Sequence, residues 1–187
     1  MGITGNIGSG KSTVSNFLKA MGYSVYNADK MAKELLLPDS PCFEEVLRAF
    51  GNEILTSGGL IDTEKLGKIV FSDPEKLNIL TSITHPELLK RIESLRGKGL
   101  VFVEAAVLVE YGWQERFDRI VLVYAYKGQR LLRAARRFGF KEAVRRDSLQ
   151  LPYAEKIKYS DYLLCNTGDL LHLKKQVESM VSELEVL

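Results

Sequence analysis

The residues best suited to chemistry lie near the start of the chain, in the stretch TGNIGSGKST. Gly5 to Ser12 matches the phosphate-loop pattern G-x-x-x-x-G-K-[ST] in full. Glycines let successive backbone N–H groups converge on phosphate oxygens. Lys11 adds a positive charge for the outer phosphates, and the Ser12 hydroxyl can ligate Mg²⁺. We therefore predict a nucleoside triphosphate site with Mg²⁺, formed by Gly8, Ser9, Gly10, Lys11, Ser12 and Thr13.

The segments around this loop match the structural context that the motif requires. A short apolar stretch at residues 1–3 precedes it, and the following segment carries apolar residues at helical spacing until Gly22. A strand, the loop and then a helix whose positive end faces the phosphates are therefore expected. A glycine-rich turn without function is the alternative, but it would need neither the lysine nor the flanking elements.

Two carboxylates follow apolar segments that we predict to be strands. Asp29 ends the segment YSVYNAD, and Glu104 lies in LVFVEAA. In open parallel sheets, ligands bind at the carboxyl ends of the strands. Asp29 could accept a hydroxyl proton or support Mg²⁺, or it could be the N-cap of a helix from Lys30; its position favours neither. Glu104 is costly to bury unpaired, which favours a functional partner over a local one.

The rest of the chain alternates between predicted strands and helices. DRIVLVYA and DYLLCNTGD are the last two predicted strands, and residues 38–99 form an inserted block with helical periodicity. Within it, Asp62 and Asp73 are expected N-caps, and His85-Pro86 is expected to open a further helix. The alternation predicts an α/β fold, with a parallel sheet covered by helices on both faces.

Positive charge is concentrated late in the chain, with seven lysines and arginines between residues 130 and 146. Nucleic-acid binding is one interpretation, but no stacking pattern of aromatic residues accompanies the charges. A solvated helix face is a second, especially for Arg130. The third is a mobile lid, with Gly139 as its flexible point, that brings guanidinium groups onto phosphates.

Composition limits the remaining function classes. Of the 187 residues, 45% are hydrophobic and 27% charged, and the net charge of +2 is too small to favour general nucleic-acid or membrane binding. Cys42 and Cys165 lack metal or redox spacing, which is typical of a cytoplasmic protein. A small-molecule kinase and a nucleotide switch or motor ATPase both remain. Against the second, the chain has neither an Asn-Lys-x-Asp signature nor a strand ending in Asp-Glu.

Several stretches together resemble the dephospho-CoA kinase family. These are GITGNIGSGKSTV, VYNAD, the block from FGNEIL to SITHP, EAAVLVEYGW, RLLRAARR with EAVRRDSLQ, and YSDYLLCNTGD. The resemblance implies a P-loop kinase fold with about five parallel strands in a three-layer arrangement. It implies a helical acceptor domain at residues 38–99 and an arginine-rich lid at residues 137–153, within a single kinase unit. The implied reaction is ATP-dependent phosphorylation of the ribose 3′-hydroxyl of dephospho-CoA.

The resemblance also implies roles for individual residues. Lys11, Asp29 and Arg137 would be catalytic, Ser12 the Mg²⁺ ligand and Asn166 a further ATP-binding residue. Asp29, His85 and Glu104 would bind the acceptor. Apart from the resemblance, we expect no nucleic-acid or membrane partner and favour a monomer over an oligomer. Asn27 stands where the family has the first Asp of Asp-Ala-Asp, and Glu104-Ala-Ala replaces its commoner Asp-x-Pro. Another P-loop kinase, acting on a nucleoside monophosphate or a sugar acid, is the alternative.

Overall fold

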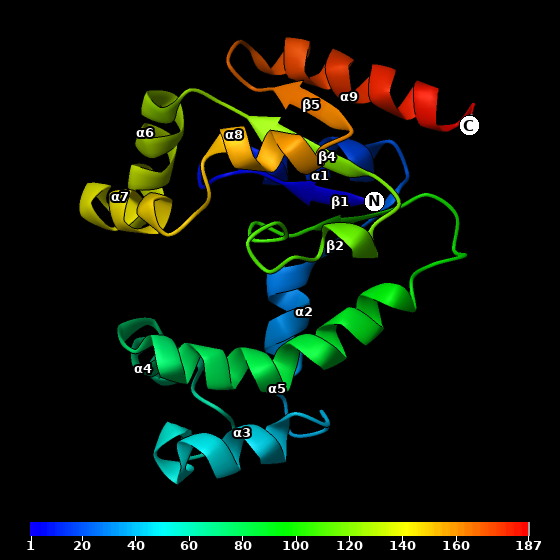
Figure 1. Cartoon of the computed structure of the whole chain (residues 1–187). Helices are drawn as coiled ribbons and strands as arrows, with labels where there is room; N and C mark the ends of the chain where they lie inside the picture. Colours follow the sequence, from blue (N-terminus) through cyan, green and yellow to red (C-terminus); the bar gives the residue numbers. More distant parts are fainter. Residues whose placement is uncertain (187) are drawn as a thin grey trace. The chain divides into compact units, whose positions relative to one another are not determined.

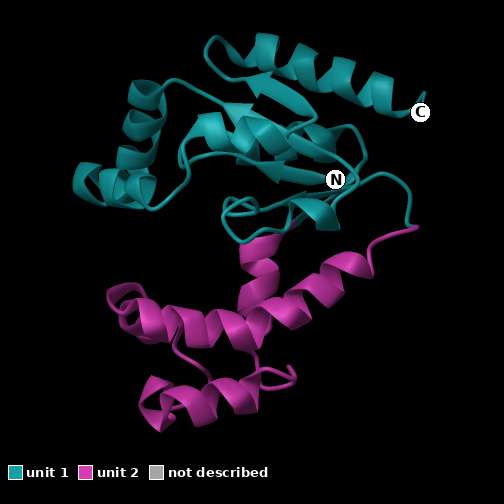
Figure 2. Cartoon of the chain, in the orientation of Figure 1, with its two compact units in different colours: residues 1–26, 98–187 teal, residues 27–97 magenta. Residues whose placement is uncertain are grey.

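The computed structural model describes residues 1–186 and divides the chain into two compact units. Residues 1–26 and 98–187 form unit 1, and residues 27–97 form unit 2 (Figure 2). Most contacts of each unit lie within that unit.

Unit 1 contains a five-stranded sheet (Figure 1). Its strands are β1 (Gly2–Thr4), β2 (Ser24–Asn27), β3 (Val101–Glu104), β4 (Ile120–Tyr124) and β5 (Tyr162–Cys165), in the order β2-β3-β1-β4-β5. β1 pairs in parallel with both β3 and β4, and β4 pairs in parallel with β5. The predicted parallel α/β sheet of about five strands is confirmed.

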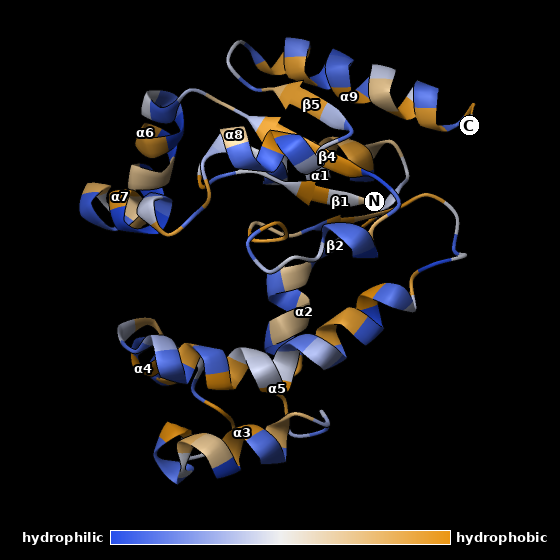
Figure 3. Ribbon diagram, viewed as in Figure 1, coloured by the Kyte–Doolittle hydropathy of each residue, from blue (hydrophilic) through white to orange (hydrophobic). Residues whose placement is uncertain are grey.

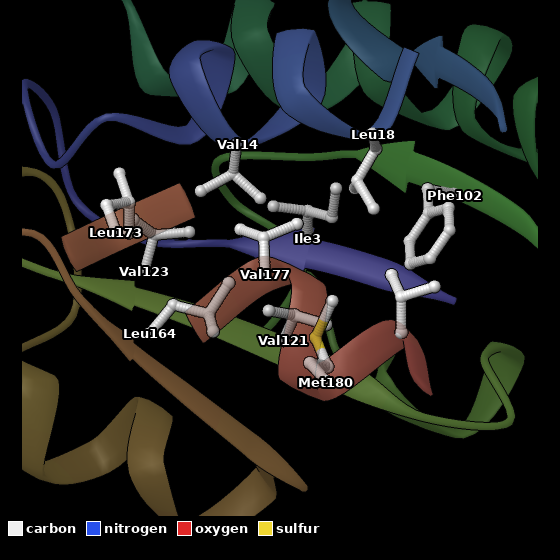
Figure 4. Packing of buried hydrophobic residues seen from close by; sticks show 11 residues of the cluster. Ile3, Val14, Leu18, Phe102, Val121, Val123, Leu164, Leu173, Val177 and Met180 are labelled. Carbon is white, nitrogen blue, oxygen red and sulfur yellow. The ribbon is translucent and has the colours of Figure 1, made fainter. Parts of the chain in front are cut away.

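One face of the sheet is covered by α1 (Lys11–Ala20) and α9 (Leu170–Leu184). β4 is almost entirely hydrophobic, whereas α9 alternates between apolar and polar residues (Figure 3), as expected for a central strand and a one-sided helix. The apolar side chains of α1, α9 and this face of the sheet interdigitate in one cluster (Figure 4). Its members are Ile3, Val14, Leu18, Phe102, Val121, Val123, Leu164, Leu173, Val177, Met180 and Val181.

The opposite face is covered by irregular and short helical segments. These are residues 105–117, which include the 3₁₀ turn η2 (Gln114–Arg116), followed later by α8 (Tyr153–Lys156) and η3 (Ile157–Tyr159). The first of these segments packs closely on β1, since a Cβ atom on Gly2 would lie 2.5 Å from Leu108 Cδ1. Between β4 and α8 lie the arginine-rich helices α6 (Lys127–Phe138) and α7 (Phe140–Ser148), joined at Gly139 with φ +78°.

Unit 2 is helical and consists of α2 (Ala28–Glu34), α3 (Phe43–Phe50), η1 (Asn52–Ile54), α4 (Thr63–Ser72) and α5 (Pro74–Glu93). Both predicted aspartate caps are confirmed. The Asp62 side chain accepts hydrogen bonds from two backbone N–H groups at the start of α4, and Asp73 does the same for α5. These carboxylates satisfy donors that would otherwise lack partners in the first helical turn.

The prediction that His85-Pro86 opens a separate helix is wrong, because both residues lie inside α5. Proline removes one backbone hydrogen bond and normally breaks a helix. Here Thr84, Leu88 and Ile92 are buried on one face of α5, on both sides of the proline. Continuous burial along this face outweighs the lost hydrogen bond, so two predicted helices form one of 20 residues. Among the described residues, no helix is long and apolar enough to cross a membrane.

Candidate functional site

The phosphate loop runs from the carboxyl end of β1 into the N-terminus of α1, as predicted. Gly8 has φ +72°, and Gly10, the N-cap residue of α1, has φ +103°. Neither position has room for a side chain. A Cβ atom would lie 1.9 Å from the Arg130 carbonyl oxygen at Gly8 and 2.2 Å from Asn166 Nδ2 at Gly10. The glycines are therefore required both by their backbone conformation and by the close approach of their neighbours.

The polar residues of the loop lie where they can receive an anion. Lys11 Nζ donates hydrogen bonds to the carbonyl oxygens of Gly5, at 2.8 Å, and Asn6, at 3.3 Å, so the ammonium group is folded over the loop. Ser12 is exposed and Thr13 half-buried in the first turn of α1, whereas Ser9 is fully buried. The N-terminus of α1 adds its positive dipole end to the lysine charge.

Asn166, predicted to bind ATP, contacts the loop itself. It follows β5, is 5% exposed, and its Nδ2 donates a 2.8 Å hydrogen bond to the Ser9 carbonyl oxygen. The Arg133 guanidinium donates to the Asn166 carbonyl oxygen at 3.2 and 3.3 Å. Arg133 is thus tied to the phosphate loop through one residue. Sequence reasoning counted it only among the seven basic residues.

Glu104 is held beside the same helix. It ends β3, which neighbours β1, and its Oε2 accepts a 2.8 Å hydrogen bond from the buried Ser15 hydroxyl. Ser15 follows Ser12 by three positions, so both lie on one face of α1. The Glu104 carboxylate therefore lies against the helix face that carries the predicted Mg²⁺ ligand. The spacing of the two serines was the signal that could have revealed Ser15.

The Ser12 hydroxyl and the Glu104 carboxylate are hard oxygen donors of the type that Mg²⁺ prefers. Within residues 1–186, no three His, Cys, Asp or Glu side chains gather in a metal-binding cluster. A magnesium ion at this loop would therefore take few protein ligands, which fits its usual use of substrate phosphates and water as the other ligands.

The basic residues between positions 130 and 146 differ in burial and in the groups that they contact. The alternative interpretation of Arg130 as a solvated residue is wrong: this residue is 5% exposed and forms an ion pair with Asp147, which is also buried. The pair joins α6 to α7 and compensates two charges that would be costly to bury alone. Arg137 instead lies over the Phe138 ring, with its Cζ 4.9 Å from the ring centroid.

Two further arginines of the basic segment contact one carboxylate. Glu142 accepts 2.8 Å hydrogen bonds from both Arg145 and Arg146. These contacts lower the pKa of Glu142 to about 2. Glu142 thus compensates one of the two arginine charges, and the exposed cluster on α7 keeps a net positive charge.

Asp29 and His85 belong to unit 2. β2 ends at Asn27, and Asp29 lies in the first turn of α2. The alternative role of Asp29 as N-cap is wrong, because the Asn27 side chain accepts the capping hydrogen bond from Lys30 N at 2.9 Å. His85 is half-buried in α5, and burial lowers its pKa. The structure brings the loop, Asn166 and Glu104 together in unit 1; the roles of Asp29 and His85 stay predictions.

Comparison with known proteins gives a consistent result. A family model described as dephospho-CoA kinase matches residues 1–172. A dephospho-CoA kinase from Aquifex aeolicus is 40% identical, and the match covers 98% of this chain and 96% of that protein. One from Carboxydothermus hydrogenoformans is 38% identical, with coverage of 98% and 93%.

Solved structures agree with the sequence matches. A Thermus thermophilus protein superposes with a TM-score of 0.81 at 37% identity, over 98% of this chain and 96% of that one. A dephospho-CoA kinase from Campylobacter jejuni gives a TM-score of 0.72 at 27% identity, with coverage of 98% and 95%. A shikimate kinase from Acinetobacter baumannii shares the fold, with a TM-score of 0.58 at 15% identity over 99% and 92% of the two chains.

Proposed function

Since the chain belongs to the dephospho-CoA kinase family, we propose that it transfers the γ-phosphoryl group of ATP to the ribose 3′-hydroxyl of dephospho-CoA. The observation that carries this proposal, beside the family match, is the phosphate loop, in which two positive-φ glycines and Lys11 form an anion-binding cradle at the start of α1. The five-stranded parallel sheet positions this cradle at the carboxyl end of its central strand.

The residues of the loop would act on the triphosphate. Lys11 would exchange its carbonyl partners for the β- and γ-phosphate oxygens and stabilise the charge that they share as the bond breaks. The loop amides and the N-terminus of α1 would hold the same oxygens in place. The Ser12 hydroxyl, with Glu104 against the same face of α1, would hold Mg²⁺, which would neutralise phosphate charge when bound.

The acceptor side of the reaction is assigned by proposal to Asp29, His85 and Glu104. A ribose hydroxyl is a weak nucleophile at neutral pH, and the Asp29 carboxylate would orient it and accept its proton. The Ser15 contact of Glu104 supports a position on the metal side of the site, beside its proposed acceptor role. We further propose Arg137 as a lid arginine that meets the transferring group. Action as a cytoplasmic monomer is part of the same proposal.

An acceptor panel tests the substrate assignment. ADP formation with Mg²⁺-ATP would be measured with dephospho-CoA, shikimate, gluconate and a nucleoside monophosphate as separate acceptors. We expect kcat/KM for dephospho-CoA to exceed that for every other acceptor by at least about a hundredfold, since each of the others lacks most of the groups that the site would recognise. A higher kcat/KM for shikimate, gluconate or the monophosphate would identify a different small-molecule kinase.

A further inference from the structure

The first half of the phosphate loop is also held by two residues that lie outside the motif. Ile7 N–H donates a 2.7 Å hydrogen bond to Gln150 Oε1, and Asn6 Nδ2 donates a 3.1 Å hydrogen bond to the Leu151 carbonyl oxygen. Gln150 and Leu151 directly follow α7 and its C-cap residue, Leu149. Two consecutive loop residues are thus held by two consecutive residues at the end of the arginine-rich helices.

The backbone that carries Gln150 is fixed in turn by a buried ion pair. Leu151 N–H donates a 3.0 Å hydrogen bond to Glu110 Oε1. The same oxygen lies 2.7 Å from Lys156 Nζ, which also donates to the Ala106 carbonyl oxygen at 3.0 Å. The Lys156 side chain is fully buried, and that of Glu110 is 13% exposed. Burial lowers the pKa of Lys156, and Glu110 opposes this shift.

Burying an ammonium group costs free energy unless the charge is paired and hydrogen-bonded, so a buried lysine at this position calls for a structural role. Both of its partners lie in residues 105–117, which cover one face of the sheet, whereas Lys156 itself lies in α8. The pair therefore ties the segment after α7 to the segment that covers one face of the sheet in unit 1. Leu151 links the pair to the loop: its N–H donates a hydrogen bond to Glu110, and its carbonyl oxygen accepts one from Asn6.

We propose that Gln150 is a positioning residue of the phosphate loop, and that the Glu110–Lys156 pair fixes the backbone from which it reaches Ile7. The inference rests on the proposed role of the loop as the ATP site. A neutral amide is suited to this place, because it holds the Ile7 N–H without bringing a negative charge to a loop that must receive a triphosphate. A carboxylate would accept the same hydrogen bond but repel the phosphates.

The test measures ATP dissociation constants by calorimetry in the absence of acceptor, for wild type, Gln150→Ala and Gln150→Glu. The control is Leu149→Ala, which trims a neighbouring side chain that is 65% exposed. We expect Gln150→Ala to weaken ATP binding about tenfold, the size of one lost hydrogen bond, and Leu149→Ala to change it less than about twofold. In steady-state kinetics, KM for ATP should rise while KM for dephospho-CoA stays constant.

Gln150→Glu separates the effect of the hydrogen bond to Ile7 from the effect of a negative charge beside the loop. We expect it to weaken ATP binding more than Gln150→Ala at low ionic strength, and the difference to shrink in about 0.5 M salt as screening increases. Wild-type ATP affinity in Gln150→Ala, or equal losses in Gln150→Ala and Leu149→Ala, would overturn the inference. If the wild type itself bound no ATP, the proposed function would fail as well, so the two failures are distinguishable.

Discussion

Replacing Gly8 by alanine tests how tightly the phosphate loop packs against α6. A Cβ atom there would lie 1.9 Å from the Arg130 carbonyl oxygen, where contacts under 3.0 Å are essentially never seen, so loop and helix must separate by about 1.1 Å. Both atoms are tied to backbone, and no side chain can rotate away to relieve the overlap. Overpacking of this kind costs about 1–3 kcal/mol. The positive φ of Gly8 adds about 1–2 kcal/mol for any L-residue.

Gly22→Ala is the matched control. Gly22 also has a positive φ, +95°, but a Cβ atom there would meet nothing within 4 Å. It should therefore lose only the backbone term of about 1–2 kcal/mol. Urea unfolding of both variants gives the comparison, and we expect Gly8→Ala to lose about 1–3 kcal/mol more, or about 2–4 °C in Tm for each kcal/mol. Equal losses would refute the close packing of Arg130 on the loop.

Four further predictions concern the proposed site and unit 2. Lys11→Ala should abolish turnover at saturating ATP, because phosphate charge loses its main stabiliser; near-normal turnover would exclude the loop as catalytic site. Arg137→Ala should lower kcat more than it raises KM for dephospho-CoA, whereas an effect on KM alone would place this arginine on the acceptor. Asp29→Asn should fold normally, because another residue caps α2, and lose at least about a hundredfold in kcat; early melting with full activity would contradict a catalytic role. Since burial lowers the pKa of His85 below its usual 6.5, the unfolded chain takes up this proton first, so the free energy of unfolding should fall as pH drops below 6.5. His85→Gln should flatten this decline in urea titrations, whereas His172→Gln, on an exposed position of α9, should leave it unchanged.

The sheet and the loop were predictable because their signals are local. A phosphate loop between a short apolar stretch and an amphipathic helix specifies strand, turn and helix within about twenty residues. Apolar runs such as LVFVEAA and DRIVLVYA indicate buried parallel strands for the same reason. These elements alone predict the layered fold.

The errors arose where tertiary burial overrode a local rule. Pro86 should end a helix, but one buried face continues through it. Arg130 looked like a solvated residue because its partner, Asp147, lies 17 positions later on another helix. Asp29 and Asn27 are both good N-caps, and only the point where β2 ends decides between them.

The individual contacts that support the loop could not be predicted, although the family resemblance implied that Asn166 binds ATP. Gln150 reaches Ile7 across 143 positions, and Asn166 reaches Ser9 across 157. No periodicity or motif connects residues so far apart. A buried lysine such as Lys156 is equally hidden, because lysine is ordinarily exposed and nothing in LPYAEKIKY distinguishes it. These contacts become visible only when the sheet brings the segments together.

The most direct test of the proposed function is the structure of its product. Phosphorus and proton NMR spectra would be recorded after incubation of dephospho-CoA with Mg²⁺-ATP, in parallel with the amount of ADP formed. We predict one new phosphate monoester, on the ribose 3′-oxygen, for each ADP released, and no ADP when dephospho-CoA is omitted. ADP formation without a new ester, or an ester at any other oxygen, would contradict the proposed reaction.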